Sequence, residues 1–453
     1  MIDLARRAFE AALEAGASDA EAYASEDRGR EVRVHGGEVE SLIAATKRGI
    51  GIRAWVGTRA GYAYDTDLSA AGIAALGARA VEAARVADED EFVAPPAPVR
   101  LLDPLGPKGA PELSDPSVAA WSTADAAGLA LAVERAALAA DERVVAVEQA
   151  VYADSAETVA ITSSTGIEGE YESSNCHAYV QALAEGEGSR ETGFGFDLGR
   201  GPGSLDPKAI GVEGAERAAS MVGAGKPASR SCPVVLDPTV AASFVAIVGR
   251  GLAASSVQRG RSPFAGRLGA AVASEALVLH DDGLDAAGPA SAPFDGEGVA
   301  RRRTALVEGG TLRAFLYDTY TARREGTDST GSAARSGYRS QPSVGPSNLV
   351  VATGELSFDE LLGEAGDGVF ITDVAGLHSG VNPVSGVFSV GASGRAIRGG
   401  ELAEPLREFT IASDLLSMLG AVLACGAEPR WVPFGAPVST PPLLIAEMTV
   451  AGS

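Results

Sequence analysis

Side chains that commonly bind transition metals are scarce in this sequence, which has four histidines and three cysteines in 453 residues. No two histidines stand at the i, i+4 spacing that places both imidazoles on one helix face, and no HExxH motif occurs. The cysteines, Cys176, Cys232 and Cys425, form no CxxC pair, and their odd number favours a reducing compartment. We therefore expect no metal site within this chain and a cytoplasmic location.

Other absences exclude further classes of protein. No run of about 18 apolar residues is present, so we expect no membrane span. The opening stretch MIDLARRAFEAALEAGA lacks the apolar segment of a signal peptide. Acidic residues outnumber basic ones by 60 to 37, and the net charge of −23 would repel nucleic acid phosphates. Aromatic residues make up only 6%, but 46% of the residues are hydrophobic, which is typical of a globular protein.

Motifs for covalent catalysis and phosphate binding are also missing. The stretch GLHSG has its serine one place too late for a GxSxG nucleophile elbow. Gly225 and Lys226 are followed by Pro227, where a phosphate-binding loop needs serine or threonine. Residue chemistry alone therefore indicates no catalytic constellation.

Hydrophobic periodicity predicts an α+β fold, in which helix-plus-strand-meander units precede a strand-rich C-terminal domain. The first unit is expected to contain helices over residues 4–13 and 69–86, and strands over 20–34, 42–46, 49–56 and 61–64. The second is expected to contain helices over 116–140 and 207–222, and strands over 143–153, 158–163 and 168–184. Two later helices are expected over 239–252 and 413–426, and a last strand over 443–450.

Breaks in composition predict the domain boundaries. Residues 1–92 form the first unit, and the proline-rich stretch 93–111 is a stiff connector. Residues 112–224 form the second unit, and residues 225–453 form the strand-rich C-terminal domain.

One C-terminal stretch, residues 373–395, is unusually rich in glycine and short polar side chains. It reads DVAGLHSGVNPVSGVFSVGASGR and contains five glycines, four serines and one histidine. Glycines allow tight turns and close backbone approach, and the polar side chains offer hydrogen bonds. Two interpretations stay open: a set of hairpin turns with His378 satisfied locally, or a loop that contacts a bound chain.

Several motifs in the last 230 or so residues, taken in order, resemble the TldD/PmbA family. They are SAPFDGEG from Ser291, LVEGGTLRAFLYDTYTARREG from Leu306, TGSAAR from Thr330, PSNLVV from Pro346, GLHSGVNPVSGVFSVGASG from Gly376 and the closing TPPLLIAEMTVAG. Within the family, the chain resembles the PmbA (TldE) branch.

The resemblance implies a division of labour between two subunits. The TldD branch resembles a zinc metallopeptidase with an HExxxH helix, but the matching positions here are Val245, Ala246 and Arg250, and none can bind zinc or accept a proton. The implied role is a non-catalytic subunit that pairs with a zinc-bearing, TldD-type HExxxH subunit around unfolded or short peptides. The candidate peptide-binding residues are Gly376, His378, Ser379, Gly380 and Asn382.

Two other hypotheses remain open at this point. The chain could be a homodimeric metallopeptidase with a non-standard site built from His378 and Cys425, although two ligands fall short of the three that a catalytic zinc needs. It could also be a regulator, since the family is named for an influence on DNA gyrase. Self-association of the unpaired chain is a further expectation.

Overall fold

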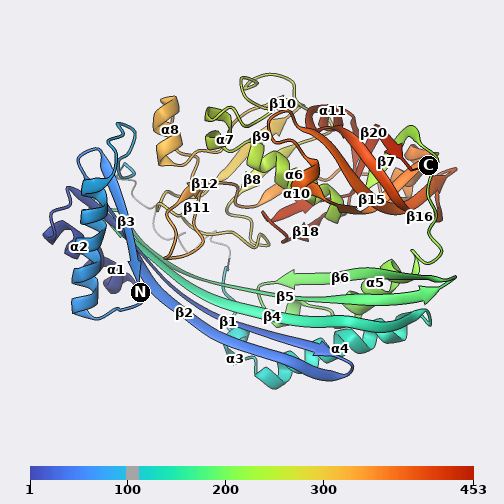
Figure 1. The fold of residues 1–453 in the computed structure, drawn as a ribbon, viewed down its shortest axis with the longest axis horizontal. Coiled ribbons are helices and arrows are strands. Elements are labelled where there is room, and N and C mark those ends of the chain that lie inside the picture. The colour runs from blue at the N-terminus through green and yellow to red at the C-terminus, as the bar shows by residue number, and fades with distance from the viewer. Residues whose placement is uncertain (98–111, 453) are drawn as a thin grey trace.

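The computed structural model describes residues 1–97 and 112–452. A long, curved sheet forms one layer, and the C-terminal domain lies against its concave side (Figure 1). The chain is therefore a mixed α and β protein with a strand-rich C-terminal domain, as predicted. Most of the predicted connector lies outside the described residues. No helix in the described ranges combines the length and apolar character needed to span a bilayer.

Both N-terminal units share one antiparallel sheet of six strands, in the order β3-β2-β1-β4-β5-β6. The units are joined because β1 pairs with β4 over fourteen residue pairs. The strands are β1 (Asp19–His35), β2 (Glu38–Val56), β3 (Arg59–Asp65), β4 (Val144–Ser163), β5 (Glu168–Gly186) and β6 (Ser189–Gly199).

Two of these strands are longer than the sequence predicts. The predicted pair 42–46 and 49–56 is one continuous strand, β2, and the predicted pair 143–153 and 158–163 is one continuous strand, β4. Thr46, Lys47 and Arg48 interrupt the hydrophobic pattern of β2, yet each pairs in register with a residue of β1. Backbone pairing to an equally long neighbour therefore overrides the local sequence signal.

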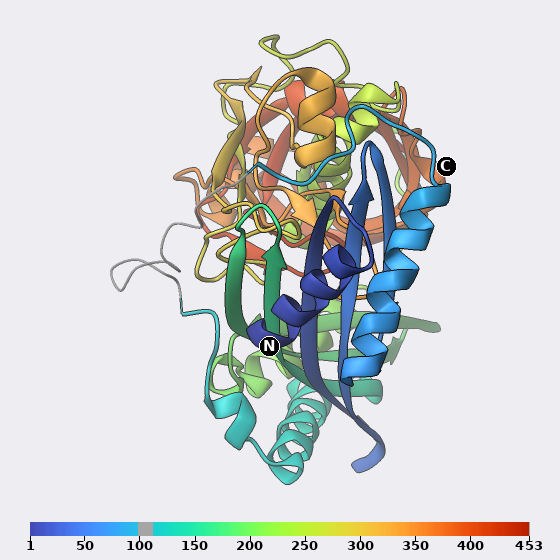
Figure 2. The same cartoon turned by 90° about the vertical axis from the view of Figure 1, so that its left-hand side faces the viewer.

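Helices cover one face of this sheet and form two cores. Helices α1 and α2 pack around Ile50 and Ile52, and helices α4 and α5 pack around Tyr152 and Val180. Figure 2 shows α1 and α2 side by side on the outer face. The helices of this layer are α1 (Ile2–Glu14), α2 (Ala70–Val86), α3 (Ser117–Ala120), α4 (Thr123–Ala140) and α5 (Pro207–Ala219), with a 3-10 turn η1 (Pro202–Ser204).

The C-terminal domain packs helix α6 (Pro238–Gly251) among two six-stranded sheets. The first sheet has the order β16-β15-β14-β7-β20-β17, with β7 (Arg230–Leu236), β14 (Gly368–Ala375), β15 (Val387–Arg398), β16 (Glu401–Asp414), β17 (Val422–Cys425) and β20 (Leu443–Ala451). The second has the order β10-β9-β8-β13-β19-β18, with β8 (Leu279–Asp282), β9 (Arg303–Glu308), β10 (Thr311–Leu312), β13 (Leu349–Val351), β18 (Arg430–Val432) and β19 (Val438–Thr440).

Short elements complete this domain. They are α7 (Ala254–Gln258), α8 (Thr319–Glu325), α9 (Phe358–Ala365), α10 (Leu377–Gly380), α11 (Leu415–Gly420) and the two-stranded pair β11 (Ala333–Ala334) and β12 (Ser343–Val344).

The predicted late helix over 413–426 is only partly helical. Helix α11 ends at Gly420, and the next residues form strand β17, which pairs with β20. The cap is Asp414 and not Ser413, because the Asp414 carboxylate accepts a hydrogen bond from the Ser417 backbone N–H at 3.0 Å. Pairing with the last strand thus outweighs the helical stripe of leucines.

A buried ion network joins the curved sheet to the C-terminal domain. Glu21 of β1 accepts from Arg335 at 2.5 Å and from Arg53 of β2 at 2.7 Å, and Arg53 also donates to Glu297 at 2.9 Å. Beside this network, the ring of Tyr338 lies over Gly49 of β2, where an added Cβ would stand 2.3 Å from a ring carbon. These contacts hold the two layers in a fixed relation.

Candidate functional site

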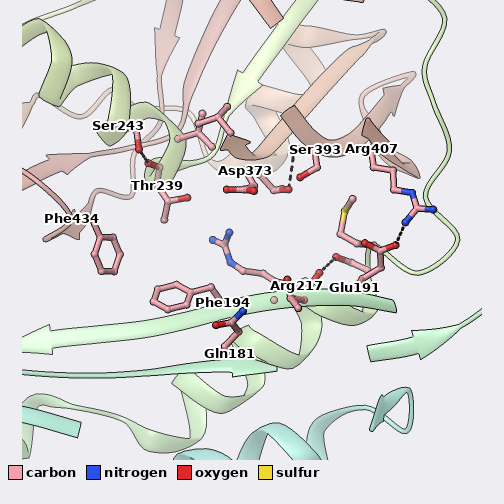
Figure 3. Close-up of a pocket in the computed structure, with 17 residues that line it drawn as sticks. Gln181, Glu191, Phe194, Arg217, Thr239, Ser243, Asp373, Ser393, Arg407 and Phe434 are labelled. Atoms are coloured by element: carbon pink, nitrogen blue, oxygen red, sulfur yellow. Dashed lines mark hydrogen bonds and ion pairs between the residues drawn. The ribbon is translucent and has the colours of Figure 1, made fainter. Parts of the chain in front are cut away.

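A cavity of about 650 Å³ lies between the two layers, at the N-terminal end of α6. Residues of β5, β6 and α5 line it from the curved sheet side, and residues of α6, β14, β15 and β16 line it from the C-terminal domain (Figure 3). The polar and aromatic side chains that line it include Gln181, Glu191, Phe194, Arg217, Thr239, Ser243, Asp373, Ser393, Arg407 and Phe434.

The two arginines of the cavity are already paired with carboxylates. Arg407 of β16 donates to Glu191 of β6 at 2.6 Å. Arg217 of α5 donates to Asp237 at 2.9 Å and to Glu213 at 3.1 Å. Asp237 is also the N-cap of α6, because its carboxylate accepts from the Thr239 backbone N–H. These pairs tie the walls of the cavity together and neutralise its basic groups.

Glu213 of α5 binds two arginines, Arg217 of the cavity and Arg430 of the C-terminal domain. Arg430 of β18 donates to both of its carboxylate oxygens. Burial would raise the pKa of Glu213, but the hydrogen bond and charge of Arg430 prevail and hold it below its usual value. The carboxylate is therefore ionised and positions Arg217.

Asp373 is the one lining carboxylate that has no hydrogen-bond or ion-pair partner among the described residues. It lies near the end of β14, opposite Ser393 of β15, and its side chain is exposed. The hydroxyls of Thr239 and Ser243 lie on the same side of the cavity (Figure 3). Thr239 donates its hydroxyl hydrogen to Asp237, and Ser243 donates its own to the Thr239 carbonyl oxygen. The cavity therefore combines one unmatched negative charge with hydroxyl oxygens that can accept hydrogen bonds.

Two phenylalanines form an apolar wall at the end of the cavity near Thr239, away from the Arg407–Glu191 pair (Figure 3). Their rings, Phe194 of β6 and Phe434 of the loop before β19, meet edge to face with centroids 5.6 Å apart. Phe434 is 53% exposed, which is unusual for so large an apolar side chain. This wall can hold an apolar side chain of a ligand.

The predicted glycine-rich loop is shorter than expected. Residues 373–375 belong to β14 and residues 387–395 belong to β15, so the connection covers residues 376–386 and contains the short helix α10. The two flanking strands extend because they pair with each other. None of the candidate residues in this loop lines the cavity.

The candidate residues of this loop are mostly exposed. The side chains of His378, Ser379 and Asn382 lie on the surface. The carboxamide oxygen of Asn382 accepts from the backbone N–H groups of Val384 and Ser385 at 2.9 and 3.1 Å, so it holds a local turn. Gly380 packs against Ser389, whose carbonyl oxygen would lie 2.6 Å from an added Cβ, and Gly376 has φ +81°. These contacts support the loop's shape and leave its peptide role a prediction.

The positions that match the zinc motif lie along α6. Val245 and Ala246 are each 3% exposed and pack in the core of the C-terminal domain, whereas Arg250 is exposed. An apolar pair and a permanent cation do not fit a zinc ion. Within residues 1–97 and 112–452, no group of three His, Cys, Asp or Glu side chains is placed to hold a metal ion.

The alternative pair of ligands lies in two different environments. Cys425 is 4% exposed, its thiol contacts the Ala276 carbonyl oxygen at 3.6 Å, and burial raises its pKa to about 11. His378 lies in the exposed loop. Because zinc binds the thiolate and not the thiol, this buried cysteine is poorly prepared as a ligand.

Sequence reasoning did not find the cavity residues as a group. Asp373 falls within the stretch that glycine content singles out, but Glu191 and Arg217 come from the second unit and Arg407 from a different strand. No local spacing in the sequence connects these residues, because they come together only when the curved sheet packs against the C-terminal domain. The glycine-rich stretch that contains Asp373 is the sequence feature that leads to this region.

Comparison with known protein families covers most of the chain. Residues 20–84 match PmbA/TldA metallopeptidase domain 1, residues 116–222 match the central domain, and residues 229–452 match the C-terminal domain. Metalloprotease PmbA of Escherichia coli is 30% identical over 442 residues, which are 97% of this chain and 94% of that protein. The chain belongs to the TldD/PmbA family. The family predicted from the sequence motifs is thereby confirmed.

Other proteins are similar to this chain over most of its length. A TldD homolog from Haemophilus influenzae is 25% identical over 90% of this chain and 87% of that protein. A Thermotoga maritima structure, described as that of a proposed modulator of a DNA gyrase, has 27% identity and a TM-score of 0.89, with 99% of both chains covered. The structure of TldE from Thermococcus kodakarensis has 22% identity and a TM-score of 0.88 over 99% of both chains, and shows the shared fold.

Proposed function

We propose that this chain is the non-cleaving, PmbA/TldE-type subunit of a TldD–TldE metallopeptidase assembly that acts on unfolded or short peptides in the cytoplasm. The observation that carries the proposal is the composition of α6: at the positions of the HExxxH motif it has Val245 and Ala246, both buried, and Arg250. A TldD-type partner would supply zinc, the general base and bond cleavage. Three buried, unpaired cysteines agree with a reducing compartment.

In this proposal the chain holds the peptide. The cavity offers hydroxyl groups, one unmatched carboxylate at Asp373 and an apolar wall at Phe194 and Phe434, so it suits an extended peptide with an amino group at one position and an apolar side chain at another. The loop from Gly376 to Asn382 begins three residues after Asp373 and offers short polar groups at the surface of the chain. Backbone hydrogen bonding to such a surface tolerates many peptide sequences.

The division of labour is tested by purifying the chain alone and together with a TldD-type subunit. We expect no stoichiometric zinc and no peptide cleavage with the chain alone, and cleavage that a chelator abolishes with the assembled pair. Zinc bound stoichiometrically to the lone chain, together with turnover of an unstructured peptide, would contradict the proposal.

The peptide-holding role is tested separately by Asp373→Asn in the assembled pair. Loss of the carboxylate should raise KM about two- to fivefold for a peptide with a free amino terminus or a lysine, and should leave KM for its acetylated, lysine-free counterpart unchanged. Asp359→Asn, an exposed carboxylate on α9, is the matched control. Equal KM values for both variants and both peptides would remove Asp373 from the site.

The rival hypotheses receive less support. A homodimeric metallopeptidase would need His378 and a deprotonated Cys425, but the thiol is buried and its pKa is raised. A regulator of a topoisomerase rests on the description of the Thermotoga maritima relative. Isolation of the chain with its bound proteins separates these possibilities: recovery of an HExxxH homologue supports the assembly, and recovery of a topoisomerase alone supports the regulator.

A further inference from the structure

A row of aromatic side chains continues the apolar wall of the cavity along the curved sheet. Phe434 meets Phe194 of β6 at the cavity, and the Phe194 ring lies 5.4 Å from the ring of Tyr179 on β5, measured between centroids. Tyr179 in turn stacks on His177 at 6.3 Å, with the two ring planes only 7° apart. These four side chains, from Phe434 to His177, are named the aromatic row.

The register of the strands explains why the rings form one row. His177 and Tyr179 are two residues apart on β5, so their side chains lie on the same face of the sheet. Ala178, which lies between them, packs on the opposite face in the core beneath α4 and α5. Tyr179 pairs with Phe196, which packs in the core of the C-terminal domain, so the row lies on the face toward that domain.

The aromatic row remains accessible. Phe434 at one end is 53% exposed, His177 at the other end is exposed, and Tyr179 and Phe194 between them are half-buried. Tyrosine and phenylalanine are enriched at binding surfaces, because a stiff ring contributes a large contact area. Accessible rings in mutual contact therefore indicate a surface that binds other apolar or aromatic groups.

Two carboxamides lie beside the rings. Gln181 of β5 lines the cavity, and its oxygen accepts a hydrogen bond from the Gln149 side chain of β4 at 3.4 Å. Both side chains are half-buried. A carboxamide carries the same kinds of donor and acceptor as a peptide bond. This pair can therefore bond the backbone of a peptide whose side chains contact the rings.

The spacing of the rings matches an extended chain. Residues two apart in an extended peptide lie about 6.6–6.8 Å from each other and point to the same side. The ring centroids of His177 and Tyr179 are 6.3 Å apart, and the next two separations along the row are 5.4 and 5.6 Å. Adjacent residues of an extended peptide point to opposite sides, so only alternate side chains can contact the row together.

We propose that the aromatic row selects extended peptides in which aromatic side chains recur at every second residue. The inference deepens the peptide-holding role proposed above and rests on it. It assigns to that role a substrate class, namely segments with the alternating pattern that β-strands have in a folded protein. It also makes His177 and Tyr179 specificity residues, although neither lines the cavity itself.

Two peptides of identical composition test the selection. One carries three phenylalanines at every second position, the other carries them in sequence, and all other positions are serine or glutamine. Acetylated and amidated ends remove any contribution from Asp373. A favourable ring pair corresponds to roughly a two- to tenfold gain in affinity. By isothermal titration calorimetry of the full chain alone, we therefore expect the alternating peptide to bind at least about fivefold more tightly than its isomer.

The double variant His177→Ala with Tyr179→Ala should bind the two peptides with equal affinity. Because Tyr179 is half-buried, His177→Gln with Tyr179→Leu keeps polar and apolar volume and should lose the preference in the same way. Tyr179→Phe keeps the ring and should retain it. The matched control, His35→Ala with Tyr64→Ala, removes the same two kinds of side chain from exposed positions of β1 and β3 and should also retain it. Melting curves identify any variant that misfolds.

Equal affinity of the wild type for the two peptides would overturn the inference. So would a preference that survives in both double variants of the row, or one that the control variant loses. Cleavage by the assembled pair, measured separately, keeps this result distinct from the proposed function. A pair that cleaves peptides while the chain does not distinguish the isomers refutes only the aromatic row, and a chain that distinguishes them in a pair that cleaves nothing refutes only the cleaving assembly.

Discussion

The buried ion network is the contact whose loss should cost the most stability, and Glu21→Gln tests it. Glu21 is 1% exposed and accepts hydrogen bonds from Arg335 and Arg53. The side chain of Arg335 is also 1% exposed, and its Nε and Nη1 atoms have no other hydrogen-bond partner among the described residues. Without the Glu21 charge, Arg335 has no ion-pair partner among the described residues, although its guanidinium still lies over the Tyr23 ring, 4.5 Å from the ring centroid.

The expected loss of stability follows from the isolation of the Arg335 charge. Removing one partner of a buried ion pair leaves an uncompensated charge and costs about 3–5 kcal/mol. If the two N-terminal units melt together, each kcal/mol shifts the melting temperature by about 2–4 °C, so the expected fall is roughly 6–20 °C. Arg53 is affected less, because it keeps Glu297 at 2.9 Å.

Thermal denaturation of three variants checks the reasoning. Glu21→Gln should show the full loss, and Glu21→Gln with Arg335→Met should recover at least half of it, because the second change removes the stranded cation. Glu404→Gln breaks an exposed pair with Arg398 and should cost less than about 1 kcal/mol. If Glu21→Gln melts like Glu404→Gln, or if the two losses in the double variant simply add, the network does not act as described.

Three further predictions follow from single contacts. Burial raises the pKa of Asp281 to about 6. Between about pH 4 and pH 6 the folded chain therefore keeps a proton that the unfolded chain loses, so stability should fall as pH rises through this range. In Asp281→Asn, the midpoint of urea unfolding should change less with pH over the same range. Gly51→Ala should destabilise the chain by roughly 1–3 kcal/mol, because its Cβ would lie 2.5 Å from the Tyr338 carbonyl oxygen. Gly128→Ala, in an open position of α4, should stabilise the chain by about 0.5–1 kcal/mol in the same urea assay. Asn382→Ala should weaken peptide turnover in the assembled pair without affecting assembly, and Asn382→Asp, which keeps the turn acceptor, should retain turnover; unchanged kinetics for Asn382→Ala would return the loop to a purely structural role.

Hydrophobic periodicity in the sequence predicted the helices that depend mainly on interactions between neighbouring residues. The first helix and the helix α6 follow from periodicity and capping residues. The continuous sheet, the strand that ends the late helix and the cavity depend on pairing between distant segments, which periodicity does not encode. Glu21 and Arg335 illustrate the limit: 314 positions separate them, and although Arg335 ends the TGSAAR motif, nothing in that motif points to Glu21.

The join between β1 and β4 has a consequence for how the chain can be divided. Each N-terminal unit repeats one order of elements, a helix, three strands and a second helix, yet each also lends side chains to its neighbour: Val32 of β1 lies in the core of the second unit, and Ala160 of β4 lies in the core of the first. A fragment of either unit would lack part of its interior and would present a bare central strand to solvent. The boundary between the two sets of elements is thus not a place to divide the chain. The pair should melt as one cooperative body, and separately expressed halves should be soluble only when they are made together.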